Sequence, residues 1–308
     1  MTNFNKQTVF IAGGDGLLGR HLLTCIDKSR YHVIVLSRNR IKSNMEGVEY
    51  VTWDTIKGMI HSTAKPDHII NLAGAGIADK RWTGKRKKEL ISSRVNSAQT
   101  IQTFLETNNI KPQSYISASA VGYYGDRGQE ILTETSNPGD EFMSECCMSW
   151  EQAALCAGKS CGRTTIIRIG IVLTTKGGAL PKMLMTKNMG IYNYFGKGLQ
   201  YYPWIHINDL CRIIVEAMHN PGMEGIYNAV APQEISNKTM MQEIMHEAQL
   251  KGILFSIPKC ILELILGEMS HVVLDSNRVS GDKILNTGFS FEFKKVGKAV
   301  SHLIKNNI

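Results

Sequence analysis

The sequence predicts an α/β fold with a doubly wound parallel sheet. Short apolar runs rich in β-branched residues alternate with helical segments from near the first residue to about residue 174. A glycine-rich turn lies between the first such run and the first helix. The chain of 308 residues is long enough for this unit and for a smaller lobe interleaved with it.

The expected strands have the composition of strands that are buried in a parallel sheet. They are residues 8–13, 32–38, 48–54, 68–74, 114–125 and 164–173. In such sheets ligands bind at the carboxyl ends of the strands. We therefore expect Asp54, Leu72, Ala73 and Gly74 to form part of a ligand site.

The same alternation predicts the domain organisation. Residues 1–174 are expected to form a nucleotide-binding domain, to which residues 203–230 return. Residues 175–308 are expected to supply a smaller, interleaved C-terminal substrate lobe, with a C-terminal extension from about residue 258.

The glycine-rich turn has the spacing of a dinucleotide-binding loop. Gly13, Gly16 and Gly19 are spaced Gly-x-x-Gly-x-x-Gly, and Leu17 and Leu18 open the following helix. The glycines permit a tight turn, a close approach of the backbone to a pyrophosphate, and close packing of the helix on the strand. The free N–H groups and the positive end of the helix dipole then bind the phosphates. The pattern predicts a Rossmann-type cofactor site at these residues.

The second expected strand ends in Ser37 and Arg38. Folds that bind NAD usually carry an Asp or Glu here, which accepts a hydrogen bond from the ribose 2′-hydroxyl. Arginine cannot accept that bond, but its planar guanidinium suits a 2′-phosphate. One such contact contributes about 1.5–3 kcal/mol, or roughly ten- to hundred-fold in affinity. We therefore expect NADP(H) as the cofactor, the alternative being that Arg38 is an ordinary surface arginine.

Composition and charge argue against several classes of protein. With 43% hydrophobic and 20% charged residues, the chain is an ordinary soluble globular protein. It has no apolar run of roughly 18 residues and no signal-peptide pattern, so we expect a cytoplasmic protein without a membrane partner. The net charge of +8 and the basic run at 80–88 suggest nucleic acid, but the run opens an amphipathic helix without an aromatic platform. A small anionic ligand accounts for the charge, and no feature defines an oligomeric state.

Two adjacent cysteines, Cys146 and Cys147, lie within an expected helix. Successive side chains on a helix point about 100° apart, which makes such neighbours poor partners. Cys146 shares its helical periodicity with Phe142 and Trp150, which predicts a small buried apolar residue. The seven cysteines form no Cys-x-x-Cys pair and show no zinc-binding spacing. We therefore expect no bound metal.

Several motifs together resemble the extended short-chain dehydrogenases, the family of sugar-nucleotide epimerases and dehydratases. They are the glycine turn, NLAG at 71–74, SRVNSAQTIQTFL at 93–105, SASAVGYYGD at 117–126, WE at 150–151 and PWIHINDL at 203–210. The chain is most similar to an atypical branch, often called epimerase-family proteins of unknown substrate, including its short C-terminal extension. The resemblance implies that Glu89, Arg94 and Val172 contact the cofactor, with a surface charge pair as the alternative for Glu89 and Arg94.

The resemblance also implies a Tyr-x-x-x-Lys dyad, which this sequence lacks. In active members the tyrosine is the acid/base, and the lysine lowers its pKa and holds the nicotinamide ribose. If Glu151 matches the glutamate that commonly follows the dyad, Met143 stands at the tyrosine position and Cys147 at the lysine position. None of the ten tyrosines has a lysine four residues later. A positioned acid/base contributes about 10²–10⁴-fold in rate, so another group must replace it or turnover is slow.

The candidates for the missing acid lie near the end of the expected strand at 114–125. Ser119, Tyr123 and Tyr124 are the hydroxyl-bearing residues there, and their alternative role is packing in the turn and pocket. Without a neighbouring lysine, a tyrosine pKa is expected to stay near about 10.

Four further residues are expected in a substrate pocket. They are Arg81, Trp82, Arg168 and His206. Arg168 lies inside an apolar strand, so it is expected to meet a carboxylate or a ligand. His206 belongs to a segment that resembles the loop closing over substrate, whereas Asp209 in the same segment fits a helix cap better.

Two functions remain open at this point. The leading interpretation is an NADP(H)-dependent oxidoreductase or epimerase-like enzyme acting on an unidentified small molecule, such as a carbonyl compound or a sugar nucleotide. The rival is a non-catalytic NADPH-binding sensor or regulatory protein. The missing dyad favours the rival, and the serines, the tyrosine pair and the closing loop favour the enzyme.

Overall fold

The computed structural model has a central eight-stranded sheet in the order β12-β8-β6-β5-β1-β2-β3-β4. The structure describes residues 6–39 and 45–305. Neighbouring strands are parallel except for β3 and β4. The strands of this sheet are β1 (Gln7–Ala12), β2 (Tyr31–Ser37), β3 (Val48–Asp54), β4 (Met59–Ile60), β5 (His68–Asn71), β6 (Ser114–Ala120), β8 (Thr164–Ile169) and β12 (Gly225–Ala229). The expected doubly wound parallel sheet is confirmed.

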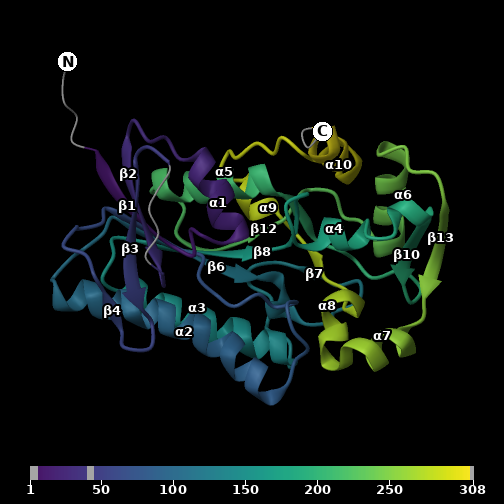
Figure 1. The fold of residues 1–308 in the computed structure, drawn as a ribbon, viewed down its shortest axis with the longest axis horizontal. Helices are drawn as coiled ribbons and strands as arrows, with labels where there is room; N and C mark the ends of the chain where they lie inside the picture. Colours follow the sequence, from purple (N-terminus) through teal and green to yellow (C-terminus); the bar gives the residue numbers. More distant parts are fainter. Residues whose placement is uncertain (1–5, 40–44, 306–308) are drawn as a thin grey trace.

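Helices cover both faces of the sheet, because the strands are apolar on both faces. Successive side chains of β1 and β2 point to opposite faces of the sheet and so pack into two separate cores. Phe10 and Ile34 belong to one core, and Val9 and Val33 belong to the other. Figure 1 shows helices along both faces. One pair is α2 (Gly84–Thr107) and α3 (Phe142–Gly158), and the other pair is α1 (Leu17–Cys25) and α5 (Ile207–His219).

The chain reverses its direction of winding beside β1. From β1 it runs outward through β2 and β3, and then returns to the other side of β1 through β5 and β6. The carboxyl ends of β1 and β5 are therefore neighbours at the point where the strand order reverses, with Ala12 opposite Asn71. In doubly wound sheets this point is where ligands bind.

Three expected strands are shorter than the sequence pattern predicts. The segment at 68–74 is strand only to Asn71. The segment at 114–125 is strand only to Ala120, and the 3₁₀ turn η1 (Val121–Tyr124) follows. The segment at 164–173 breaks at Gly170, where a Cβ atom would lie 2.6 Å from the carbonyl oxygen of Pro203. The chain then leaves the sheet, and β9 (Ile171–Leu173) pairs with β11 (Trp204–His206). Apolar composition predicts burial in the second and third of these segments but not the bend.

The remaining segments form a smaller lobe beside the sheet, at the right of Figure 1. Its elements are α4 (Ala179–Met183), η2 (Lys187–Met189), β10 (Ile191–Phe195), α6 (Asn237–Glu247), β13 (Ile253–Ile257), α7 (Lys259–Leu266), η3 (Gly267–Ser270), α8 (His271–Leu274) and α10 (Val296–Lys305). Its centre is the parallel ladder of β10 and β13, against which α6 packs, and α10 packs on α6. The short helix α9 (Asp282–Leu285) lies instead beside β12 of the large sheet. A short ladder of β7 (Ile131–Leu132) and β14 (Arg278–Val279) joins the last segment to the region after β6.

Between the two parts of this lobe the chain returns to the large sheet. Residues 204–229 supply β11, α5 and β12; α5 packs beside α1, and β12 pairs with β8. The smaller lobe is therefore interleaved in sequence with the sheet. In the part of the chain that the structure describes, no helix is long and apolar enough to cross a bilayer.

Candidate functional site

A cavity of about 590 Å³ opens at the reversal point of the sheet. The glycine-rich turn forms one wall, and the segment after β5 forms another. Its lining residues are Gly13, Asp15, Gly16, Leu36, Arg38, Trp53, Thr55, Leu72, Ala73, Gly74, Ala75, Gly76, Asp79, Lys80, Arg86, Glu89 and Ser93. Its volume lies in the range typical of small-molecule and cofactor sites.

Two glycines of the turn have a steric reason, and the third caps the following helix. Gly13 has a φ of 78°, and a Cβ atom there would lie 2.8 Å from the carbonyl carbon of Leu72. A Cβ atom at Gly19 would lie 2.3 Å from the carbonyl oxygen of Gly13. Gly16 is the N-cap of α1 and has no side chain to accept a bond from the first-turn amides. These N–H groups and the helix dipole are therefore available to an anion.

The end of β2 forms the opposite rim of this cavity. Arg38 is exposed and lines it. Ser37 is buried, and its hydroxyl donates to the Asp15 carboxylate at 3.3 Å. Asp54 does not line the cavity: its carboxylate accepts from the N–H groups of Ile56 and Lys57, which lowers its pKa and closes the turn between β3 and β4. The expected wall residue is thus a turn residue.

Helix α2 contributes charged groups, and here the structure separates the expected pair. Glu89 faces the cavity and makes a 2.8 Å ion pair with Arg86. Arg94 is 5% exposed and lies outside the cavity lining. Its guanidinium stacks on Trp150 at 4.7 Å and donates to the backbone oxygen of Leu90, and burial lowers its pKa. Helical geometry alone could not show that Arg94 points inward while Glu89 points out.

Arg94 nevertheless supports the cavity wall from beneath. A Cβ atom at Gly74 would lie 3.0 Å from the guanidinium carbon, so the NLAG segment packs directly on this arginine. Its Nε has no hydrogen-bond partner among the described residues. Leu17 and Leu18 lie in the first turn of α1, and Val172 packs against the core on that side rather than lining this cavity.

A second cavity of about 370 Å³ lies between the sheet and the C-terminal segment. It is mainly apolar, with a few polar groups. Its lining residues are Ile77, Trp82, Lys87, Ala120, Val121, Gly122, Gly125, Glu141, Phe142, Met143, Ile169, Gly170, Ile171, Tyr201, Tyr202, Pro203, Glu268, His271, Val272, Asp275 and Asn277. The loop after β5 lines both cavities, with Gly76 and Asp79 in the first and Ile77 in the second, so the two cavities share one wall.

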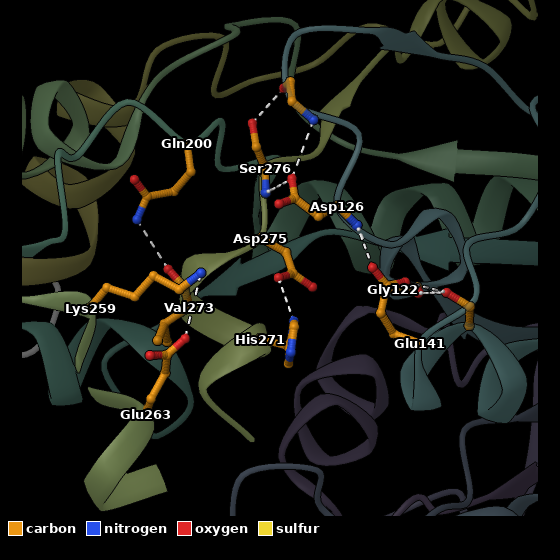
Figure 2. Close-up of polar contacts among 12 residues, drawn as sticks. Gly122, Asp126, Glu141, Gln200, Lys259, Glu263, His271, Val273, Asp275 and Ser276 are labelled. Carbon is orange, nitrogen blue, oxygen red and sulfur yellow. Dashed lines mark hydrogen bonds and ion pairs between the residues drawn. The ribbon is translucent and has the colours of Figure 1, made fainter. Parts of the chain in front are cut away.

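The polar groups of the second cavity come largely from the C-terminal segment. The Nδ1 atom of His271 lies 2.8 Å from Asp275 Oδ1, as Figure 2 shows. Burial raises the pKa of Asp275 to about 6, although the hydrogen bond from His271 lowers it. The negative charges of Asp126 and Glu141 disfavour ionisation of Asp275 and raise its pKa further. The result is a carboxyl group that can exchange a proton near neutral pH.

Two further carboxylates order the wall around this pair. Glu141 accepts from the backbone N–H of Asp126, and the Asp126 carboxylate accepts from the N–H of Ser276 (Figure 2). The Ser276 hydroxyl donates to the backbone oxygen of Gly128. The turn after β6 is thereby tied to the C-terminal segment. Sequence reasoning missed Glu141, His271 and Asp275, because nothing in the sequence places the C-terminal segment over the end of β6.

An ion pair crosses this cavity between the two parts of the molecule. Lys87 of α2 pairs with Glu268 of η3, and the ammonium lies 5.0 Å from the centre of the Phe142 ring. Trp82 lines this cavity and stacks edge-on against Phe142. Arg81 is exposed and packs beside Gly267 instead of lining the cavity.

The expected substrate residue Arg168 belongs to a buried network beneath the site. It is 1% exposed and makes two 2.8 Å hydrogen bonds with the Glu151 carboxylate. Burial alone would lower its pKa, but the bonds and charge of Glu151 raise it. Arg168 thus meets a carboxylate, one of its two expected partners, and it lies outside the lining of either cavity.

The three expected acid candidates join the same network. The Ser119 hydroxyl donates to Glu151 at 2.6 Å, and the Tyr124 hydroxyl donates to Asn228 at 2.7 Å. Tyr124 is fully buried, which raises its pKa, and the Tyr123 ring lies flat on the Arg168 guanidinium at 3.4 Å. The expectation that these side chains face the substrate is therefore corrected: packing and the buried charge hold them away from the cavity lining.

His206 is also displaced from the expected pocket. It is fully buried, caps α5 by accepting from the Asn208 N–H, and stacks on Phe293 at 3.8 Å. Burial and the neighbouring His302 lower its pKa to about 3. Asp209 is not the cap: its carboxylate accepts from the backbone N–H groups of Glu292 and Phe293 and so anchors the C-terminal segment.

The positions of the missing dyad carry no group suited to proton transfer. Met143 lines the second cavity, where the resemblance would place a tyrosine. Cys147 is 1% exposed beside the backbone oxygen of Ala120, and burial raises its pKa to about 12. Cys146 is equally buried and packs with Trp82 and Leu90, which confirms its expected role as a small apolar residue.

The sheet order and the glycine turn at its reversal point define a Rossmann-type α/β protein. A family model described as the NAD dependent epimerase/dehydratase family matches residues 9–229. A second model, described as a domain of unknown function (DUF1731), matches residues 257–303. The chain belongs to the NAD dependent epimerase/dehydratase family, and the expected C-terminal extension is confirmed.

Relatives match along nearly the whole chain. An epimerase family protein of Staphylococcus epidermidis is 35% identical over 301 residues, covering 96% of this chain and 98% of its own. The epimerase family protein YfhF of Bacillus subtilis is 33% identical over 301 residues, covering 97% and 98%.

The fold is similar to that of solved structures of the same family. The human epimerase family protein SDR39U1, determined with NADPH, has a TM-score of 0.88 and 27% identity, covering 97% of this chain and all of that one. A nucleoside-diphosphate sugar epimerase from Corynebacterium glutamicum has a TM-score of 0.75 and 30% identity, and covers 97% of this chain and 58% of its own.

Proposed function

We propose that this protein is an NADP(H)-dependent oxidoreductase or epimerase-like enzyme that acts on a small carbonyl compound or sugar-nucleotide-like molecule. The observation that carries the proposal is the pair of cavities that share the loop after β5. One is walled by the glycine turn and Arg38, and the other is apolar with an ionisable pair in its wall.

The first cavity fits a dinucleotide with an additional phosphate. The open first-turn amides of α1 suit a pyrophosphate, and Gly13 and Gly16 leave room for it. Asp15 and Glu89 are occupied by Ser37 and Arg86, whereas exposed Arg38 offers a guanidinium fork at the rim. The similarity to a human protein determined with NADPH supports this choice.

The second cavity fits the reacting end of a substrate. When bound, NADP(H) donates or accepts a hydride there. The apolar walls, including Trp82 and Phe142, exclude water. We assign the accompanying proton to the pair of His271 and Asp275, because a group with a pKa near neutrality is efficient in both directions of transfer.

Cofactor preference tests the first half of the proposal. Isothermal titration should show NADPH binding at least about tenfold more tightly than NADH, because one charge-assisted contact to the 2′-phosphate contributes about 1.5–3 kcal/mol. Arg38→Ala should remove most of that difference. Arg30→Ala is the matched control, since Arg30 is an exposed arginine just before the other end of β2. Equal affinities for the two cofactors in the unmodified protein would contradict the proposal.

Turnover tests the second half. Loss of NADPH absorbance should be measured against a panel of carbonyl compounds and sugar nucleotides. With an active compound, His271→Gln and Asp275→Asn should lower kcat by about 10²-fold while the Kd for NADPH changes little, since a proton transfer and not a cofactor contact is lost. His246→Gln, an exposed histidine on α6, is the control. Full activity in both variants would exclude this pair as the acid/base.

A non-catalytic NADPH sensor is the second candidate. Met143 and the buried, protonated Cys147 stand where the resemblance implies the dyad, which favours it. A sensor would bind NADPH without oxidising it in the presence of any compound of the panel. It would then show a protein partner whose affinity differs between the NADPH-bound and the free state.

A further inference from the structure

Three side chains with metal-binding atoms meet where α1 packs on α5. His21 and Cys25 are four residues apart on α1 and so lie on one face of that helix. Cys211 of α5 faces them. A ring nitrogen of His21 and the two sulfur atoms all lie within 4.8 Å of one another. Within the part of the chain that the structure describes, this is the one group of three such residues.

The group lies apart from both cavities described above. None of the three residues lines the cofactor or the substrate cavity. The His21 ring is held in place from α5, because its Nε2 lies 2.7 Å from Asn208 Oδ1. Proteins commonly orient a metal-binding histidine by a hydrogen bond to the ring nitrogen that does not bind the metal, which here leaves Nδ1 of His21 as the ligand.

The two sulfur atoms differ in their access to solvent. Cys25 is exposed, whereas Cys211 is fully buried, so the group has one sulfur at the surface and one in the core. Zinc binding displaces the protons of its cysteine ligands.

The group is open to solvent on two sides. A hollow of about 450 Å³ reaches Cys25, and one of about 540 Å³ reaches His21. The guanidinium of Arg212 lines the first hollow, but its charge is paired with Asp209 and Glu292. An ion can therefore enter from water, and a water molecule can occupy a remaining coordination position.

We propose that His21, Cys25 and Cys211 bind one zinc ion, which links α1 to α5. Imidazole and thiolate are the ligands that zinc prefers, and three protein ligands with one open position form a four-coordinate site. Tetrahedral zinc with its ordinary bond lengths to nitrogen and sulfur needs donor atoms about 3.5 Å apart. A small rotation of the exposed Cys25 side chain brings its sulfur atom to that distance. The ion then stabilises α1, whose first turn carries the glycine-rich loop.

The test uses the full-length protein after treatment with a chelator and a phosphine reductant. Zinc should bind at one equivalent in competition with a chromophoric chelator and should raise Tm. Cobalt should give a thiolate-to-metal charge-transfer band. Cys25→Ser and His21→Gln should each weaken zinc binding by at least about 100-fold, since the loss of a direct ligand exceeds the effect of losing an orienting group. Cys260→Ser, an exposed cysteine on α7, should change nothing.

Three results would overturn the proposal. The first is the absence of stoichiometric zinc binding by the reduced protein. The second is zinc binding that survives both Cys25→Ser and His21→Gln, which would indicate another set of ligands. The third is a cobalt complex without a thiolate band. Cys25 and His21 are chosen because they are more exposed than Cys211, whose replacement would also disturb the core.

Discussion

The guanidinium of Arg168 is buried beside the sheet, and its partners explain why four expected site residues do not line either cavity. The four are Arg168 itself, Ser119, Tyr123 and Tyr124. Glu151 neutralises Arg168, Ser119 satisfies the same carboxylate, and the rings of Tyr123 and Tyr124 flank the guanidinium. A buried charge that loses its partner is strongly destabilising, because neither water nor another charge replaces it. The network is therefore structural, and its members differ sharply in energetic weight.

Glu151→Gln should lower the free energy of unfolding by about 3 kcal/mol or more, because Arg168 keeps its charge without a counter-charge. Ser119→Ala should cost only about 1 kcal/mol, the net value of one hydrogen bond. Urea unfolding followed by circular dichroism measures both. Glu130→Gln is the control, since its ion pair with Arg127 is partly exposed and contributes at most about 1 kcal/mol. Equal losses in Glu151→Gln and Glu130→Gln would contradict a structural role for the buried pair.

At the scale of elements, the C-terminal segment is fastened to the start of α5. The Asp209 carboxylate accepts hydrogen bonds from two backbone N–H groups of that segment, and Phe293 stacks on His206. His302 of α10 lies 3.3 Å from the His206 ring. This contact holds α10 over the large sheet and makes the attachment sensitive to acid, because the site accommodates only a neutral His206.

Acid should weaken this attachment. The pKa of His206 is about 3 in the folded protein and about 6.5 in the unfolded chain. Its contribution is therefore complete above about pH 6.5 and is lost as the pH falls toward 3, because the unfolded chain takes up a proton that the folded protein cannot. Buried His68, whose pKa is lowered to about 4, acts in the same direction.

His206→Gln should reduce the acid dependence of stability by up to about 1.4 kcal/mol per pH unit between about pH 6 and pH 4. Urea unfolding across this range measures the slope. His246→Gln should leave the slope unchanged, since that side chain is 86% exposed. An unaltered slope in His206→Gln would show that His206 titrates freely in the folded protein.

At the scale of the whole molecule, the shape of the first cavity depends on the close approach of the carboxyl ends of β1 and β5. Gly13 turns the chain with positive φ directly against the backbone of Leu72 and Ala73. A side chain there would push β1 and β5 apart and widen the reversal point of the sheet. The shape of the first cavity and the stability of the central sheet are thus coupled through one residue.

Gly13→Ala should cost several kcal/mol of stability and abolish NADPH binding, because the added methyl group meets backbone atoms that cannot move independently. Gly58→Ala is a matched control: its φ is also positive, at 67°, but no atom lies within 4 Å of the added carbon. It should cost only about 1–2 kcal/mol, the penalty of the backbone conformation itself. Thermal unfolding and titration with NADPH measure the two effects. Similar losses in the two variants would show that steric contact at Gly13 has little weight.

Whether a feature could be predicted from the sequence depends on how far apart in the chain the interacting residues lie. The strands, the glycine turn and the burial of Cys146 could be predicted, because local spacing reports periodicity and backbone requirements directly. The direction of Arg94, the turn at Asp54 and the burial of Tyr124 could not, because each depends on partners far away in the sequence. Tertiary partners of this kind override local preference.

The sequence by itself determined the fold class, the place of the glycine-rich turn and the family. The first two depend on local patterns, and the family depends on short motifs that can be read in order along residues 9–229. Only the tertiary structure brought His271 and Asp275 over the end of β6, and His21 and Cys25 against Cys211. The spacing of residues along the chain does not reveal such long-range contacts. His21 and Cys25 meet Cys211 because α1 and α5 pack side by side on one face of the sheet. His271 and Asp275 reach the end of β6 because Ser276, the next residue, is hydrogen-bonded to the turn that follows that strand.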